Sequence, residues 1–498
     1  VQKNCANLCT IVHLYSEKNI AESILSALWA TLTLQEHLEM KKINKEDSKR
    51  TFLRGWLRFL RSVERAKKKK PAQEKNGSLR FSDETTPVQN QVATFIENIS
   101  IIKEYDSSIL RRDAEKILIP KYFDLYDNPE KSLLFISAAT KLIARGKWKS
   151  YIFDYKKNKK HCLGLECLLG VALTAARQSN INFKDTMIQI NGIYPKDEQY
   201  LEIIRDVGLV KEISNAAPGK VLDSTEASKK ANPKKRIFSA DSIGKENASA
   251  FAHDRKNVTA EKFTAYINEC LNDHNLKLVH EAEKHLTSCM GELLDNAERH
   301  CGLEQRPRWY LRGFVNNNVR NPICELAVFN FGKTISETFD NLPEDHFSLS
   351  QQVNPYINKH IKKKGMFKEG LTTVAALQGR VSCKNEKETD SSGTGTIELL
   401  KLFQDMHDNL KKMGRDIKGG IKMTLISGST HINFDGSYKL KQRLVNDEES
   451  DIFTYPFNDV GLESEPDRNY LKRMKDARFP GVMINIRFPL PENATQRT

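Results

Sequence analysis

The sequence predicts an α+β protein with more than one domain, and three observations carry this prediction. Its 498 residues exceed what a single hydrophobic core usually organises. The first 112 residues show mainly helical periodicity, whereas residues 113–213 alternate between helix and strand patterns. Further along, β runs flank glycine turns that lead into helices. We therefore expect a helical region at 1–112, a small α/β domain at 113–213, a linker at 214–258 and an α/β sandwich domain at 259–498.

The N-terminal region is distinguished by a basic segment. Residues 41–70 hold 13 Lys or Arg against 3 Asp or Glu, an excess of 10 in a chain whose net charge is +14. Apolar residues recur there at helical spacing, which places the charges on the other face of an amphipathic helix. Two interpretations stay open. Charge runs are usually solvated faces of docked helices, but such a face can also bind nucleic-acid phosphates or an acidic partner.

Composition and cysteine usage limit the class of protein. No apolar run approaches the roughly 18 residues that a membrane-spanning helix needs, and the first residues lack the pattern of a secretory signal. The nine cysteines are odd in number and irregularly spaced, which is typical of reduced thiols rather than of a disulfide framework. We expect a cytoplasmic protein without a membrane partner.

The alternating segment predicts a small α/β domain followed by a linker. Its expected elements are a helix at 132–144, a strand at 150–155, a helix at 163–176, a strand at 187–190 and a helix after Pro195. This order, with "IFDY" leading into an apolar helix and "IQINGIYP" before another, resembles the STAS domains of bacterial anti-sigma antagonists. Phosphorylated STAS domains carry a Ser where that strand turns into the helix, whereas "KKNKKHCLGLE" has no hydroxyl residue here. Ser214 to Asn257 are polar and predict the linker.

The string "GELLDNAERH" carries a candidate for phosphate chemistry. It belongs to a helix expected from about Leu276 to His300, with Gly302 as its C-cap. Glu292 and Asn296 are four residues apart, so both project from one helix face. The carboxylate can orient or deprotonate a water that attacks a γ-phosphate, and the amide oxygen can ligate the Mg²⁺ that bridges the phosphates. Such a pair can also be a solvated hydrogen-bonding pair, so the residues downstream decide.

Two glycine turns follow this helix. The first comes after an expected strand at 324–329 and reads Asn330, Phe331, Gly332, Lys333. The second comes about a hundred residues after the helix and opens another helix, whose N-terminal amides favour phosphate; it comprises Ser392, Gly393, Thr394, Gly395 and Thr396. A long polar and basic stretch, 341–390, separates the turns, and loops of that length are usually functional. Closing β runs contain Thr424 and Ser427, which we interpret as structural.

These features resemble the GHKL superfamily of gyrase, heat-shock chaperone, histidine kinase and mismatch repair ATPases, over about Thr259 to Pro491. The "ExxDNA" pattern matches at Glu292, Asp295, Asn296 and Ala297. The resemblance implies a Bergerat-type ATP-binding domain with Glu292 as the catalytic residue, Asn296 as the Mg²⁺ ligand, both glycine turns as nucleotide-binding and 341–390 as a mobile lid. The superfamily has an Asp where this chain has Asn330, and an amide makes a weaker hydrogen bond to adenine. Adenine selectivity therefore stays open.

Three functions follow from these patterns. The first is a slow, Mg²⁺-dependent ATPase that acts as a lid-gated switch, with a protein partner or as a homodimer, in a bacterial regulatory or phage-defence system. The second is a serine/threonine kinase of anti-sigma-factor type. The third is a nucleic-acid-binding module in which ATP is structural and the basic helix at 41–70 supplies the affinity.

Overall fold

The computed structural model describes residues 91–101, 112–113, 116–145, 148–179, 188–215, 235–242, 252–303, 309–317, 322–388, 390, 392–393, 395–412, 421–445 and 448–490. All of these belong to one unit of the chain, Glu84–Thr498. The expected basic helix at 41–70 lies outside the described residues. Within the described part of the chain, no helix is both long enough and apolar enough to cross a lipid bilayer.

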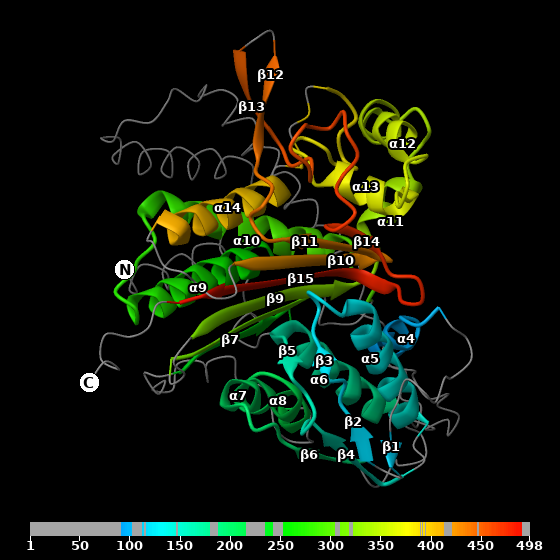
Figure 1. Cartoon of the computed structure of the whole chain (residues 1–498), viewed down its shortest axis with the longest axis vertical. Helices are drawn as coiled ribbons and strands as arrows, with labels where there is room; N and C mark the ends of the chain where they lie inside the picture. The colour runs from blue at the N-terminus through cyan, green and yellow to red at the C-terminus, as the bar shows by residue number, and fades with distance from the viewer. Residues whose placement is uncertain are drawn as a thin grey trace, which may run out of the picture. The chain divides into compact units, whose positions relative to one another are not determined.

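The described residues form an α+β structure, as the sequence predicts, around a seven-stranded sheet (Figure 1). Each pair of neighbouring strands in this sheet is antiparallel. From one edge to the other the strands are β14 (Leu471–Arg473), β11 (Thr430–Phe434), β10 (Lys422–Gly428), β15 (Phe479–Pro489), β9 (Ile323–Phe331), β8 (Tyr310–Asn316) and β7 (Lys235–Asp241). The closing strand β15 therefore lies in the middle of the sheet.

Three helices cover one face of this sheet (Figure 1). They are α9 (Ala252–Asn272), α10 (His280–Arg299) and α14 (Gly395–Lys412). Successive side chains of a strand point to opposite faces, and on β9 the even-numbered Cys324, Leu326 and Val328 join the core beneath these helices. The odd-numbered residues of β9 consequently face the other way.

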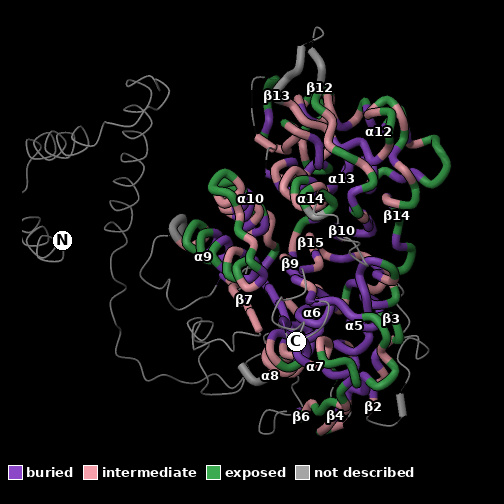
Figure 2. The backbone as a smooth tube through the Cα atoms, turned by 60° about the vertical axis from the view of Figure 1, so that its left-hand side comes forward, coloured by how far each residue is buried: buried purple, intermediate pink, exposed green. Residues whose placement is uncertain are grey.

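An α/β layer occupies the opposite face and matches the expected order of helices and strands. Its four-stranded sheet has the order β1-β2-β4-β6, in which β2, β4 and β6 are parallel. Its elements are α4 (Gln91–Glu97), β1 (Arg112–Asp113), β2 (Lys116–Leu118), β3 (Tyr122–Phe123), α5 (Pro129–Ala144), β4 (Ser150–Asp154), β5 (Lys160–His161), α6 (Leu163–Ser179), β6 (Gln189–Ile193), α7 (Glu198–Asp206) and α8 (Leu209–Asn215). Figure 2 shows α6 buried along most of its length between this layer and β9.

The N-terminus of α6 is capped by the large sheet. The amide of Leu163 donates to Glu325 Oε2 on β9 at 2.7 Å, and the amide of Gly164 donates to Asn485 Oδ1 on β15 at 2.9 Å. Helix N-termini carry unsatisfied amides and a partial positive charge, so a carboxylate is a favourable partner there. The capping side chains come from strands more than 150 residues downstream, so the two layers share one core.

The expected lid region contains three helical segments as well as irregular stretches. Residues 341–390 contain the π-helical turn η5 (Ser348–Val353), α12 (Asn354–His360) and α13 (Lys368–Ala376), which follow the short helix α11 (Ile335–Asp340). A two-stranded hairpin of β12 (Lys441–Val445) and β13 (Glu448–Thr454) lies nearby, and the Gly379 amide bonds to the Phe453 carbonyl. The long polar segment is thus not one open loop, and its longest irregular stretch follows α13.

Two sequence-based expectations differ from the structure. The predicted linker contains β7, which pairs along its whole length with β8 and completes the sheet edge. Its leading cations, Lys235 and Arg236, conceal the strand in the sequence. In the structure Arg236 pairs with Glu269 of α9 and with Asp273, which directly follows that helix. Gly302 is not the C-cap of α10, since that position is His300. A side chain at position 302 would collide with Phe95 and with the backbone of Gly332, so a glycine is needed there.

A buried acidic group stabilises the α/β layer internally. Glu166 of α6 accepts hydrogen bonds from the Tyr155 hydroxyl at 3.0 Å and from the Leu209 amide at 3.2 Å. His161 lies 3.4 Å from its other oxygen. Burial raises the pKa of Glu166 from 4.5 to about 7 and lowers the pKa of His161 to about 3. Both groups are therefore neutral in mildly acidic solution.

The raised pKa predicts that stability falls as the pH rises through this range. The contribution of Glu166 is fully present below pH 4.5, declines as the pH approaches 7 and is lost above it, for a total of about 3 kcal/mol. Glu166→Gln keeps an acceptor but cannot ionise. Urea unfolding at intervals from pH 4.5 to 8 should show the wild type losing stability relative to Glu166→Gln, and parallel curves would contradict the assignment.

Removing the cap of α6 tests how much the hydrogen bond between the α/β layer and the large sheet contributes to stability. Glu325→Ala leaves the Leu163 amide without its acceptor and should lower the free energy of unfolding by about 1 to 3 kcal/mol. Glu325→Gln retains an acceptor and should lower it less. Chemical denaturation of both variants measures the difference; equal losses would mean that the hydrogen bond is not what matters.

Candidate functional site

Helix α10 presents the predicted pair on its solvent face. Glu292 and Asn296 are both exposed, while Leu286, Cys289, Met290, Leu294 and Ala297 are buried on the opposite side. This amphipathic pattern fixes the rotation of the helix. His280 and His285 are exposed too, and His285 pairs with Glu398 of α14 at 3.2 Å, so it is a surface histidine.

The second glycine turn lies against Glu292. A Cβ atom built on Gly395 would lie 2.0 Å from Glu292 Oε2, so only a glycine permits this approach. The Cys289 thiol also points to the Gly395 carbonyl, at 3.8 Å. Gly393 has φ +97° and lies against the Val381 backbone. The structure thus brings the start of α14 to the Glu292 carboxylate. Ser392 precedes Gly395 in this turn and Thr396 follows it, whereas Thr394 lies outside the described residues.

The first glycine turn lies at the C-terminal end of α10. The Gly302 amide donates to the Phe331 carbonyl and the Lys333 amide to the His300 carbonyl, both at 2.9 Å. Gly332 has φ +148°, and a Cβ there would lie 2.2 Å from the His300 oxygen. Residues 330–333 are therefore fixed beside the helix end that carries Asn296.

Asn330 continues the even-numbered series of β9 that faces the helices. It pairs with Val482 of β15 and is only 3% exposed, and its Nδ2 has no hydrogen-bond partner within the described part of the chain. A carboxamide supplies both a donor and an acceptor. Burial of an unpaired amide is costly, which favours a ligand group as its partner.

Positive side chains gather around the same helix end. Burial lowers the pKa of His300, and the charges of Arg299, Lys333 and Lys384 lower it further. Arg299 donates to Asn296 Oδ1 at 3.1 Å and pairs with Asp295. Burial alone would raise the pKa of Asp295, but Lys256 and Arg299 hold it below its ordinary value. Like charges placed together are unfavourable alone and favourable around an anion.

Sequence reasoning missed Arg299 and Lys384. Arg299 could have been found, because it follows Asn296 by three residues and so shares its helix face. Lys384 gave no local signal, since it is one of many lysines between α11 and α14. It is held in place by the loop around Asn385, whose Nδ2 donates to the carbonyls of Arg380 and Ser392 at 3.0 Å each.

Two predicted β-sheet residues are structural, as expected. The Ser427 hydroxyl accepts from the Ile335 amide at 2.8 Å, which fixes the start of α11, and Thr424 Oγ1 donates to the Ile432 carbonyl at 3.3 Å. Both side chains are fully buried, and each hydroxyl has a partner within the sheet or at the start of α11. Across the described segments, no group of three or more His, Cys, Asp or Glu side chains could hold a metal ion.

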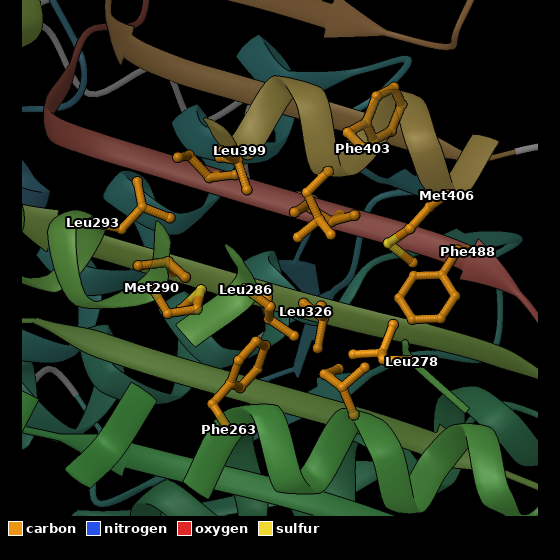
Figure 3. A pocket seen from close by; sticks show the side chains of 15 residues that line it. Phe263, Leu278, Leu286, Met290, Leu293, Leu326, Leu399, Phe403, Met406 and Phe488 are labelled. Atoms are coloured by element: carbon orange, nitrogen blue, oxygen red, sulfur yellow. The ribbon is translucent and has the colours of Figure 1, made fainter. Parts of the chain in front are cut away.

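An apolar cavity lies beneath α10 and does not include Glu292 or Asn296. It measures about 40 Å³ and is enclosed by α9, α10, α14, β9 and β15. Figure 3 shows Met290 and Leu293 pointing into it from α10, opposite Leu399 and Phe403 of α14. A space lined only by apolar groups stays dry. We interpret it as imperfect packing between helices rather than as the reactive site.

Comparisons with known proteins give no assignment. No family model matches this chain, and neither a curated protein nor a solved structure does. Any functional conclusion consequently rests on the geometry above.

The close approach at the first glycine turn can be tested with a matched glycine. Gly332 and Gly461 have almost the same φ, +148° and +146°, but a Cβ at Gly461 would meet nothing within 4 Å. Both Ala variants incur backbone strain of about 1 to 3 kcal/mol. Gly332→Ala should cost about 1 to 3 kcal/mol more, because its Cβ also clashes with the backbone of His300 and Gly302, just after α10. Thermal unfolding compares them, and equal losses would rule out the close contact.

Proposed function

We propose that the domain formed by α9 to β15 binds Mg²⁺–ATP at the C-terminal half of α10 and hydrolyses it slowly, as a GHKL-type ATPase with a Bergerat fold. One observation carries the proposal. Three segments more than thirty residues apart converge there: Glu292 lies against Gly395, and residues 330–333 are hydrogen-bonded to the helix end beyond Asn296. No local folding requirement calls for this combination of carboxylate, carboxamides, glycines and cations.

Each group has a task in this proposal. Glu292 is exposed beside the start of α14 and can orient and deprotonate the attacking water. Arg299, Lys333 and Lys384 attract the phosphates, and the amides at the start of α14 add donors. The buried amide of Asn330 binds the base. A bound Mg²⁺ neutralises phosphate charge, and Asn296 is the side chain that would hold it.

The amide oxygen of Asn296 fits this task only after a rearrangement. It accepts a hydrogen bond from Arg299, whose charge would repel a cation held by that oxygen. An Arg299 guanidinium released from Asn296 and from its pair with Asp295 would be available to the phosphates. Ligand binding is thus coupled to a side-chain movement at the edge of the site, which is consistent with a switch.

A lid-gated switch requires a mobile segment beside the site. The stretch between α13 and α14 is the candidate, because it carries Lys384 and is connected to the second glycine turn through Asn385. The helices α12 and α13 would move with it or serve as its support. We propose that nucleotide reshapes this stretch and so alters contacts with a protein partner or a second copy, in a bacterial regulatory or phage-defence role.

Phosphotransfer within the chain to the α6 turn is disfavoured. That turn lies against the face of the sheet opposite Glu292, where its amides are bonded to Glu325 and Asn485. A kinase would therefore need a substrate on another molecule. Incubation with γ-labelled ATP separates the two activities, since label in protein indicates a kinase and free phosphate alone indicates an ATPase.

Substitutions on α10 test the proposal directly. Glu292→Ala should bind ATP but lower the rate of phosphate release by about 100-fold or more, because the general base is lost. Asn296→Ala should weaken Mg²⁺-dependent binding by about tenfold or more. Phosphate release and calorimetry on the full chain measure both. Glu281→Ala, an exposed acid in the first turn of the same helix, is the control that should change neither. Wild-type protein that binds no nucleotide would refute the proposal.

A further inference from the structure

A second hollow lies at the β14 edge of the large sheet, and none of its lining residues belongs to the ATP site proposed above. Its volume of about 410 Å³ is within the range of small-molecule sites. Residues from α11, the N-terminus of α13, the β10–β11 turn, β14 and the approach to β15 line it. They are Ser336, Asp340, Phe367, Lys368, Glu369, Ser429, Arg473 and Arg478.

The charges of this hollow favour an anion. Three cationic and two acidic side chains line it, which leaves one positive charge in excess. Arg478 is held by Glu337 at 2.8 Å, and Lys368 by Asp340 at 3.1 Å. Arg473 lies over the Phe367 ring, 5.7 Å from its centroid, and has no acidic partner within the described segments. Its guanidinium edge is therefore available to a ligand.

Uncharged donors point to the same place. Helix α13 starts at the hollow, and no side chain caps its first amides. Such amides and the helix dipole attract anions. Ser336 is only 4% exposed and lines the hollow, yet its hydroxyl makes no hydrogen bond to any described residue. This hydroxyl can therefore donate to or accept from a ligand in the hollow.

The carboxylate of Glu369 can act as a hydrogen-bond acceptor for a ligand. Glu369 accepts from the Ser429 amide at 3.2 Å and from the Ser429 hydroxyl, so its Oε2 faces the β10–β11 turn. Its Oε1 lies 3.5 Å from the Arg478 guanidinium and has no hydrogen-bond partner within the described residues. An acceptor beside several donors suits a molecule that has both an anionic group and hydroxyl groups.

We propose that this hollow binds a small phosphate monoester that carries hydroxyl groups, such as a sugar phosphate. Arg473, the first amides of α13 and the Ser336 hydroxyl hold the phosphate, while Glu369 accepts from a ligand hydroxyl. The concave shape favours a free small molecule over a phosphorylated side chain of another protein. Arg478 connects the hollow to Glu337, which caps the start of α11, so the ligand stabilises the helix that follows Lys333.

Calorimetry with ribose 5-phosphate on the full chain tests this site, with ribose as the uncharged control. Wild type should bind ribose 5-phosphate saturably and ribose not at all. Arg473→Ala should weaken binding by about tenfold or more, and Ser336→Ala by a smaller factor, because a charge-assisted contact is the stronger of the two. Lys475→Ala, which removes an exposed cation two residues from Arg473 that does not line the hollow, should leave binding unchanged.

The outcomes separate this site from the ATP site. Glu292→Ala should bind ribose 5-phosphate as the wild type does, whatever its effect on ATP. Arg473→Lys, which keeps the charge but not the paired donors, should give intermediate affinity and covers the case of an unstable Ala variant. A phosphoserine peptide that binds more tightly than ribose 5-phosphate would overturn the small-molecule assignment. Absence of wild-type binding, or binding that Arg473→Ala leaves intact, would overturn the site.

Discussion

Strand β9 packs against a different layer on each of its two faces, and the rest of the structure depends on this double contact. Its odd-numbered residues face the α/β layer, where Ala327, Phe329 and Phe331 join the core and Glu325 caps α6. Its even-numbered residues face the helices and end in Asn330 beside the proposed nucleotide site. A shift of one residue in register would exchange the two sets. The period of a β-strand therefore couples the position of the α/β layer to that of the site.

The same arrangement determines what the α/β layer can do. Helix α6 begins directly after β5, and its first amides are bonded to Glu325 and Asn485 of the large sheet. Burial raises the pKa of Glu325, with the charge of Arg487 and the Leu163 amide opposing this effect. A phosphate group at the start of α6 would find the amides of Leu163 and Gly164 already bonded, and it would lie beside the Glu325 carboxyl. We infer that this layer is a fixed support of the large sheet rather than a substrate of it.

Cationic groups lie on two sides of α11. Lys333 precedes the helix and belongs to the cluster around His300, whereas Arg478 holds Glu337 of the helix itself and lines the second hollow. The helix is only six residues long and is held by a capping box at Thr334 and by the Ser427 hydroxyl. So short an element has little stability of its own. Ligands on either side would therefore affect it, which gives the two proposed sites a physical connection.

The sequence by itself determined the elements whose spacing is local. It predicted α10 with Glu292 and Asn296 on one face, the strand before Asn330, both glycine turns and the order of the α/β layer, because side-chain direction follows from backbone period. Tertiary structure alone decided the rest. It placed β7 in the sheet through pairing with β8 about 75 residues away, placed helical segments within the expected lid, and brought Lys384 to Arg299. The identity of a side chain's neighbours depends on long-range packing, which no local period encodes.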